Sequence, residues 1–480
     1  MLCFKQMNER RKRWTVLVLV SVVMAMGYVF WDIVSPISTS LKASLEEGGM
    51  GWSAAEYGFY AGSYSIFNIF LLMLFFGGVI LDKCGIRFTG LLATGVMLLG
   101  AIINYAALTM VSPLLEIDVP FTLFGLIPGH LKTQVLVASL GFGLFGMGCD
   151  ITGITVSKII TKWFIGHELA SAMGLQVAMA RLGTASALSF SPLIAQGFGL
   201  SASLLAGAGV LLFGFVLFVI YTFYDRHFDR EQAARRTGRS NGSAVSIDAK
   251  SETKEESFRL RDICVILRNP GFWLLALLCV SFYSSIRPFM KFATDLMINT
   301  FGVAETTAGW LVAAIPYGTI VLTPLFGTLY DRYGHGARLM LGGSVLLLVA
   351  DLLLAFPLSH SAAYALVIML FVGIAFSLVP SAFWPSVPKL VPLAQLGTAY
   401  SIIYFVQNIG LMLVPVWIGG IVDRHTMRSN DGLSSLHVDY TIPMVVFAVI
   451  SLLAVATSLT LLLSDGTKKD GLEQANMSQQ

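Results

Sequence analysis

Charged side chains stand inside long apolar segments of this chain, and they are the residues best suited to chemistry there. Placing an ionisable group at the centre of a membrane helix costs about 2.5–3.5 kcal/mol on insertion scales, so each one needs a reason. Asp150 falls within the apolar stretch 133–157, and Arg181 falls within the next stretch, 168–195. An acid and a base on neighbouring helices suit a solute with an amine at one end and a carboxylate at the other. The alternative is that Asp150 and Arg181 pair with each other.

A third intramembrane charge, Asp32, follows Tyr28 and Trp31 in the first apolar stretch. Three roles are open for it. It could bind the amine of a solute, it could carry a proton that couples to transport, or it could cap a break in the helix before Pro36. Tyr28 and Trp31 would then contribute aromatic surface beside it.

Arg287, Lys291 and Asp295 recur every four residues around Pro288, which places them on one face of a helix. Arg287 is a candidate contact for an anion, because its guanidinium presents a fork of donors. If this helix is short, Lys291 and Asp295 lie simply at the outer water interface.

Uncharged polar and aromatic residues occur in two later apolar stretches. Gln407 and Asn408 differ by about 100° around a helix, so at most one of them points directly into a cavity. Trp384 precedes Pro385, where a kink is expected, and is a candidate cavity wall or hinge. Tyr404 is a further candidate for the wall.

Cofactor chemistry and catalysis are not predicted. The run from Gly141 to Gly146 matches the pattern Gly-x-Gly-x-x-Gly, but it lies within an apolar helix and no strand precedes it, so tight helix packing is the better explanation. The seven histidines fall in loops or near the ends of apolar stretches. No metal-ligand spacing and no pairing of a nucleophile with a base is present, so we expect neither an enzyme, a cofactor nor a metal site.

Composition identifies the elements that position these residues. The chain is 56% hydrophobic and only 12% charged, about half the charged fraction of a soluble domain. Spanning helices need about 20 apolar residues, and this length predicts an all-α membrane protein of 12 transmembrane helices. The expected spans are 14–40, 54–81, 88–111, 133–157, 168–195, 200–224, 270–299, 304–330, 337–358, 361–388, 393–421 and 440–464.

A charged, Ser-rich segment, 225–268, divides the chain into six-helix bundles at 14–224 and 269–464, with tails at 1–13 and 465–480. Most Lys and Arg residues fall on the side of the two tails, which predicts that both termini are cytoplasmic. The positive net charge therefore reflects topology, and nucleic-acid binding is not expected. No cysteine falls in an external loop, so no external disulfide is expected, and a bacterial inner membrane is favoured.

Two internal repeats indicate that the halves are related. In each half a short charged turn follows the second span, and we expect these turns to control the conformational change. Their residues are Gly78, Asp82, Lys83, Gly85 and Arg87 in the first half, and Gly327, Asp331, Arg332, Gly334 and Arg338 in the second. The second repeat matches Glu168 to Gly183 with Gln395 to Gly410.

The charged turns resemble the loop signature of the major facilitator superfamily. The stretches Trp384 to Tyr400, Gln407 to Gly410 and Gly174 to Arg181 resemble the subgroup that contains the lysosomal dipeptide transporter of animals. This resemblance implies two pseudo-symmetric bundles around a cavity that opens alternately to each side. It also implies a dipeptide held by its termini, with Asp150 at the amine and Arg181 at the carboxylate. The family has Glu, one methylene longer, where this chain has Asp150.

Together these features predict a transporter of small zwitterionic solutes, with dipeptides expected, either secondary active or facilitative. A carrier of carboxylates or other organic anions is the alternative, and it would use Arg181, Arg287 and Lys291. A membrane sensor that binds without transporting is a third. The expected partners are the small-molecule solute and the lipid bilayer. Proton coupling through Asp32 or Asp150 and an accessory subunit remain open.

Overall fold

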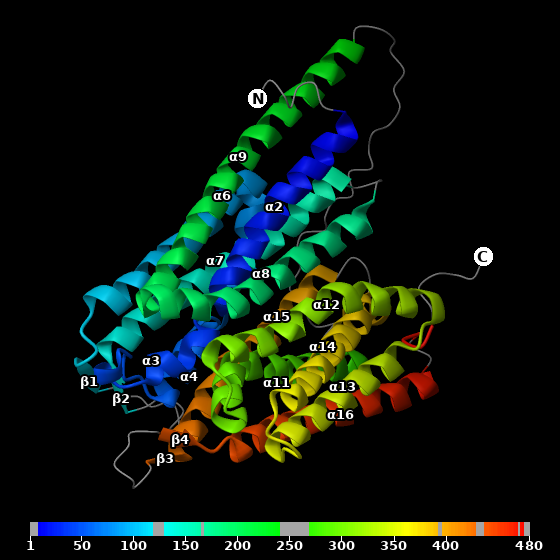
Figure 1. Ribbon diagram of the computed structural model, residues 1–480. Helices are drawn as coiled ribbons and strands as arrows, with labels where there is room; N and C mark the ends of the chain where they lie inside the picture. The colour runs from blue at the N-terminus through cyan, green and yellow to red at the C-terminus, as the bar shows by residue number, and fades with distance from the viewer. Residues whose placement is uncertain are drawn as a thin grey trace.

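The computed structural model describes residues 8–118, 129–164, 168–240, 268–391, 396–428, 436–468 and 471–474. These residues form a helical protein of two halves, each made of long helices packed side by side (Figure 1). Eleven helices in the described part of the chain are long and apolar enough to cross a membrane. The predicted class, an all-α membrane protein with two bundles, is confirmed. Most of the predicted segment 225–268 lies outside the described residues.

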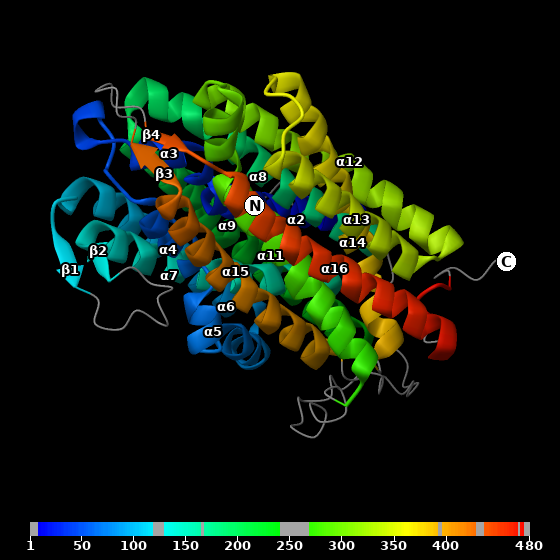
Figure 2. The same ribbon diagram turned by 90° about the horizontal axis from the view of Figure 1, so that it is seen from below.

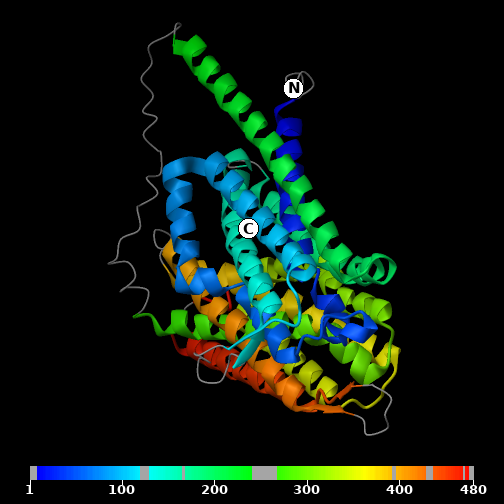
Figure 3. The same ribbon diagram turned by 90° about the vertical axis from the view of Figure 1, so that its left-hand side faces the viewer.

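The N-terminal half is built from long helices and several short ones. The long helices are α2 (Glu9–Asp32), α6 (Met73–Met110), α7 (Thr133–Phe164), α8 (Leu169–Phe198) and α9 (Leu200–Ser240). The short elements are η1 (Ser35–Ile37), α3 (Ser38–Lys42), η2 (Leu45–Glu47), α4 (Ala54–Ser63) and α5 (Ile66–Phe70). Figure 3 shows α9 projecting beyond its neighbours. Its end, residues 225–240, is helical although this part of the sequence was expected to belong to the linker.

The described residues of the C-terminal half form six long helices. They are α11 (Pro270–Phe301), α12 (Glu305–Tyr333), α13 (Gly336–Ala355), α14 (Ala362–Leu390), α15 (Leu396–Arg424) and α16 (Thr441–Lys468). Figure 2 shows this half from below, with α16 beside α11. Two antiparallel hairpins lie in the connections, β1 (Glu116–Asp118) with β2 (His130–Lys132) and β3 (Thr426–Arg428) with β4 (Leu436–Val438).

The second predicted span, 54–81, is not one continuous helix. It is divided among α4, α5 and the beginning of α6, and Leu72 has a φ of 48° where α6 begins. Polar residues explain the first interruption. The hydroxyl of Ser63 donates a hydrogen bond to the carbonyl of Tyr60 at 2.7 Å, and such back-bonding competes with the helical ladder. The expectation of a single helix was therefore wrong in this detail.

Glycine explains the matching turns of the two halves. Gly85 has a φ of 78° and Gly334 a φ of 73°. A side chain at such an angle is strained, so glycine is the residue that suits both turns. Gly85 interrupts α6 and separates its first part from the third predicted span. The repeated sequence therefore corresponds to a repeated backbone conformation.

The halves approach each other at one end and diverge at the other (Figure 1). We call the first the hairpin end, because α3 and both hairpins lie there, and the second the terminus end, because α2 begins and α16 finishes there. Helix α4 packs on α15, and α8 packs on α12, across the boundary between the halves. Backbones come close at this boundary, since a Cβ on Gly58 would lie 2.3 Å from the carbonyl oxygen of Pro415.

Candidate functional site

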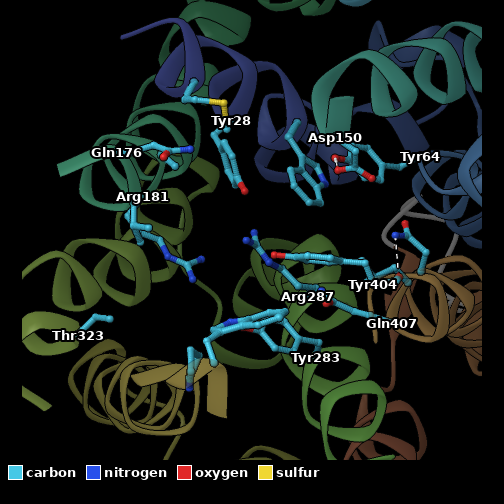
Figure 4. Close-up of a pocket in the computed structure, with 18 residues that line it drawn as sticks. Tyr28, Tyr64, Asp150, Gln176, Arg181, Tyr283, Arg287, Thr323, Tyr404 and Gln407 are labelled. Atoms are coloured by element: carbon cyan, nitrogen blue, oxygen red, sulfur yellow. Dashed lines mark hydrogen bonds between the residues drawn. The ribbon is translucent and has the colours of Figure 1, made fainter. Parts of the chain in front are cut away.

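A cavity of about 310 Å³ lies between the two halves. Both halves contribute polar and aromatic residues to it, and Figure 4 shows the principal side chains directed toward one space. Its polar and aromatic lining residues are Tyr28, Trp31, Tyr64, Asp150, Gln176, Arg181, Tyr283, Arg287, Thr323, Trp384, Tyr404, Gln407 and Asn408. An apolar wall with a few converging polar groups is the usual construction of a site for a small solute.

Asp150, on α7, is one polar end of the cavity. Its carboxylate accepts a hydrogen bond from the hydroxyl of Tyr64 at 2.8 Å and another from the side-chain amide of Asn68. No cation among the described residues pairs with it. The alternative that Asp150 and Arg181 neutralise each other is therefore not seen in this conformation. A neutral hydrogen-bond shell leaves the carboxylate able to accept a cationic group from a solute.

Arg181, on α8, and Arg287, on α11, form the opposite polar region (Figure 4). The Cζ atom of Arg181 lies 4.1 Å from the centroid of the Phe376 ring. The Cζ atom of Arg287 lies 4.8 Å from the ring of Trp31 and 5.3 Å from that of Phe376. Contacts with ring faces stabilise a guanidinium while leaving its N–H edge free for an anion.

Aromatic side chains hold the walls in place. Trp31 stacks on Tyr64 at 4.1 Å between centroids, and Trp384 stacks on Tyr404 at 5.1 Å. The indole N–H of Trp384 also donates to the hydroxyl of Tyr283 at 3.1 Å. These contacts limit the rotamers of the lining residues, which lowers the ordering cost of binding.

Gln407 and Asn408 lie in different surroundings, as their separation around α15 suggested. Asn408 is 4% exposed and its side-chain oxygen accepts a hydrogen bond from Ser65 at 2.6 Å. Its amide donates to the carbonyl of Tyr404. Gln407 is less engaged, with a long contact of 3.6 Å from the thiol of Cys279. Gln407 is therefore the freer of the two for a solute.

Asp32 is the one candidate binding residue that does not line the cavity. Its carboxylate forms an ion pair with the Nζ of Lys291 at 2.7 Å, and both side chains are buried. The alternative that Lys291 lies at the outer water interface is not seen, because Lys291 is only 7% exposed and its ammonium also donates to the carbonyl of Trp31. Asp295 is likewise 1% exposed, and it binds Lys42, Thr39 and Tyr440.

Sequence reasoning missed four polar or aromatic lining residues, Tyr64, Gln176, Tyr283 and Thr323. Tyr283 stands four residues before Arg287 and therefore shares its helix face, a spacing that could have identified it. The other three carry no such signal, because tyrosine, glutamine and threonine occur in helix packing as well.

The charged turns lie at the terminus end and bond within their own halves. Arg87 donates to the carboxylate of Asp225 at 2.7 Å and also binds Asp229. Arg338 pairs with Glu473 at 3.2 Å. Lys83 and Arg332 are exposed, and a Cβ added at Gly78 or Gly327 would meet open space. Asp331 makes an interaction there, whereas the side chain of Asp82 lies outside the description.

Among the described residues no group of three or more His, Cys, Asp or Glu side chains is placed to hold a metal ion. The Major Facilitator Superfamily matches the chain over residues 16–415 and again over 289–477. The chain belongs to the Major Facilitator Superfamily. It is thus an integral, multi-pass membrane transporter of small molecules.

Two relatives of this family are similar over most of the chain. The lysosomal dipeptide transporter MFSD1 of Danio rerio is 26% identical over 364 residues, covering 74% of this chain and 70% of that protein. The human protein of the same name is 24% identical over 421 residues, covering 86% of this chain and 80% of that protein. Within the superfamily the chain is therefore similar to the MFSD1 proteins. These relatives are membrane transporters and not enzymes.

Solved structures support the fold independently. A bacterial homolog of the human lysosomal transporter Spinster, inward-facing and occupied, has a TM-score of 0.64 at 15% identity, with 95% of this chain and 98% of that chain covered. The nucleoside transporter NupG has a TM-score of 0.62 at 14% identity, with 95% of this chain and 99% of that chain covered. At these identities the likeness concerns the fold alone.

Proposed function

We propose that this transporter moves small zwitterions, and dipeptides in particular, by alternating access. One observation supports this most: Asp150 and Arg181 line the same cavity, and neither has an oppositely charged partner among the described residues. In this proposal Asp150 binds the amine of the solute and Arg181 binds its carboxylate. The similarity to MFSD1 proteins supports the same substrate class.

Binding by the two termini leaves the side chains of the dipeptide to be accommodated by the aromatic walls. Tyr28, Trp31, Trp384 and Tyr404 offer flat surfaces of this kind, and Gln407 offers an amide. Aromatic faces accept varied side chains, because stacking and dispersion demand little directional matching. We therefore infer that the two charged ends are required for binding and that the aromatic walls accept varied uncharged side chains.

The test uses purified protein and four ligands of similar size: Ala-Ala, N-acetyl-Ala-Ala, Ala-Ala amide and glutarate. Binding is followed as a ligand-dependent rise in melting temperature. We expect Ala-Ala to bind, and blocking either end to weaken binding by about tenfold or more, because a hydrogen bond to a charged group contributes about 1.5–3 kcal/mol. Arg181→Ala should lose the discrimination at the carboxylate end, and Asp150→Asn that at the amine end.

Asp351→Asn is the matched control for Asp150→Asn. Asp351 is also a buried aspartate in a helix, but it lies outside the cavity lining and is held by Ser285 and Ser451. Its replacement should leave the ranking of the ligands unchanged. Equal binding of the capped and free peptides would reject the proposal. Binding of glutarate alone would favour the organic-anion carrier, which would bind its substrate through Arg181 and Arg287.

Transport itself needs a separate measurement, because a sensor would also bind. Purified protein in liposomes should exchange labelled Ala-Ala across the membrane, and Asp150→Asn should slow the exchange. Repeating it with and without a proton gradient distinguishes a proton symporter from a uniporter. Asp32 and Asp150 are the candidate proton carriers. Binding without exchange in either condition would support the sensor.

We infer that the terminus end faces the cytoplasm, in a bacterial inner membrane. Basic residues of the described chain gather there, including Arg87, Lys162, Arg338 and Lys389, as the positive-inside rule expects. The closed hairpin end would then make this an inward-facing conformation. Labelling of a cysteine introduced at Glu46 by an impermeant reagent added outside intact cells tests the orientation.

A further inference from the structure

The cavity and its surroundings contain five charged residues, and their charges do not cancel. Asp32 and Lys291 neutralise each other in a buried ion pair of 2.7 Å. The remaining three are Asp150, Arg181 and Arg287, all partly exposed to the cavity. A zwitterion bound between Asp150 and Arg181 would leave Arg287 without an anion. A cation held in a site of low dielectric is costly without one, which points to a solute with a second negative group.

The two arginines share one aromatic ring. Arg181 and Arg287 both contact Phe376, at 4.1 and 5.3 Å from Cζ to centroid. Neither forms an ion pair with a carboxylate of the described residues. In Figure 4 the two guanidinium groups extend into the same part of the cavity. They are therefore placed to bind two carboxylates that belong to a single residue of the solute.

Asp150 is separated from Arg287 by the stacked rings of Trp31 and Tyr64. Arg287 contacts Trp31, Trp31 stacks on Tyr64, and the hydroxyl of Tyr64 donates to Asp150. This order separates the region for carboxylates from the region for the amine. An acidic side chain on the first residue of a dipeptide would be brought toward Asp150, where like charges repel. An acidic side chain on the last residue would stay beside Arg287.

We propose that Arg287 is a specificity residue that makes the transporter prefer dipeptides with Asp or Glu at the C-terminal position. The inference rests on the proposed function, since it assumes that Arg181 binds the terminal carboxylate. Arg287 then binds the side-chain carboxylate of the same residue. The organic-anion alternative uses the same arginines but makes no use of the amine or of residue order.

Three peptides test the proposal on the unmodified protein: Ala-Glu, Ala-Gln and Glu-Ala. Ala-Gln has nearly the shape of Ala-Glu without its extra charge, and Glu-Ala has the same composition and net charge in the reverse order. We expect Ala-Glu to bind about tenfold or more tightly than either, as is usual for a charge-assisted contact. Affinity is measured by calorimetry at fixed pH and salt.

Arg287→Gln should abolish the difference between Ala-Glu and Ala-Gln, whereas Arg287→Lys should retain part of it, because the charge remains and the fork is lost. If all three peptides bind the unmodified protein equally, the specificity inference is overturned and the dipeptide proposal stands. Equal binding of Ala-Glu and Glu-Ala, both above Ala-Gln, overturns the positional claim. If no peptide binds, the proposed function itself fails, and the inference with it.

Discussion

At the hairpin end charged side chains of one half bond to the other half, whereas at the terminus end they bond within their own half. Asp32 meets Lys291, Lys42 meets Asp295, and Ser40 donates to Glu305, all across the boundary. Arg87 and Arg338, at the other end, find acceptors in their own halves. The hydrogen bonds between described residues of the two halves use residues 31–65 of the N-terminal half.

Under the proposed alternating access, the difference indicates which interactions must break when the transporter changes state. Opening the hairpin end requires the loss of ion pairs and of the two bonds by which Asp423 caps the start of α4, at 2.6 and 2.8 Å. Burial, together with the carboxylate of Asp295, raises the pKa of the Tyr440 hydroxyl, so it stays protonated and donates to that carboxylate. At the terminus end, where the halves diverge, no equivalent set joins described residues of the two halves.

The largest expected effect comes from Asp32→Asn. The substitution removes the only carboxylate bound to Lys291 among the described residues and leaves a buried ammonium with neutral acceptors, the backbone carbonyl of Trp31 and the amide oxygen of the new side chain. Breaking one side of a buried ion pair costs about 3–5 kcal/mol, so the closed hairpin end should be destabilised by that order. Spin labels at Glu46 and Ala304, in opposite halves, should report a longer distance.

The control for this substitution is the double variant Asp32→Asn with Lys291→Met, which removes both charges. It should recover much of the short distance, since an apolar side chain replaces the unpaired cation. An unchanged distance in Asp32→Asn alone would show that the ion pair does not hold the hairpin end closed.

Gly62→Ala should have the next largest effect. A Cβ at Gly62, on α4, would lie 2.4 Å from the carbonyl oxygen of Met412, on α15 of the other half. Since backbone is the obstacle, the helices must separate, at a cost of about 1–3 kcal/mol. The same pair of labels measures the opening. Gly209→Ala is the matched control, because a Cβ there meets open space within α9; a similar shift in both variants would exclude steric separation as the cause.

The candidate site shows what the sequence could and could not predict. Nine of the ten candidate binding residues line the cavity, because a charge, an amide or a polar aromatic group in an apolar helix needs a partner or a solute. Asp32 was the exception. Whether a carboxylate in an apolar helix lines the cavity or pairs with a lysine of the other half depends on how the halves pack. No local sequence pattern predicts that packing.

The helices were predictable from apolar runs, but the break in the second span was not. Hydropathy averages over many residues. It therefore does not detect the single hydrogen bond from Ser63 to Tyr60 or the left-handed backbone of Leu72. The charged turns were predictable for the opposite reason. Gly85 and Gly334 both have a positive φ, a local backbone requirement that favours glycine. The sequence therefore shows a glycine at the same place in both turns.

The smallest expected effects compare the two halves at the terminus end. Arg87 binds Asp225, whose side chain is fully buried, and Lys162 and Trp163 bind the same carboxylate. Arg338 and Glu473 have side-chain exposures of 65% and 25%. Arg87→Gln should therefore cost about 2 kcal/mol of unfolding free energy, as for a hydrogen bond to a charged group. Arg338→Gln should cost less than about 1 kcal/mol, as for a solvated pair.

Thermal unfolding in detergent at low and high salt measures both substitutions. The loss caused by Arg338→Gln should vanish at high salt, since solvated charges are screened, and the loss caused by Arg87→Gln should largely persist. Equal losses with equal salt dependence would mean that the buried environment of Asp225 adds nothing. The N-terminal half would then be no more firmly held together at this end than the C-terminal half.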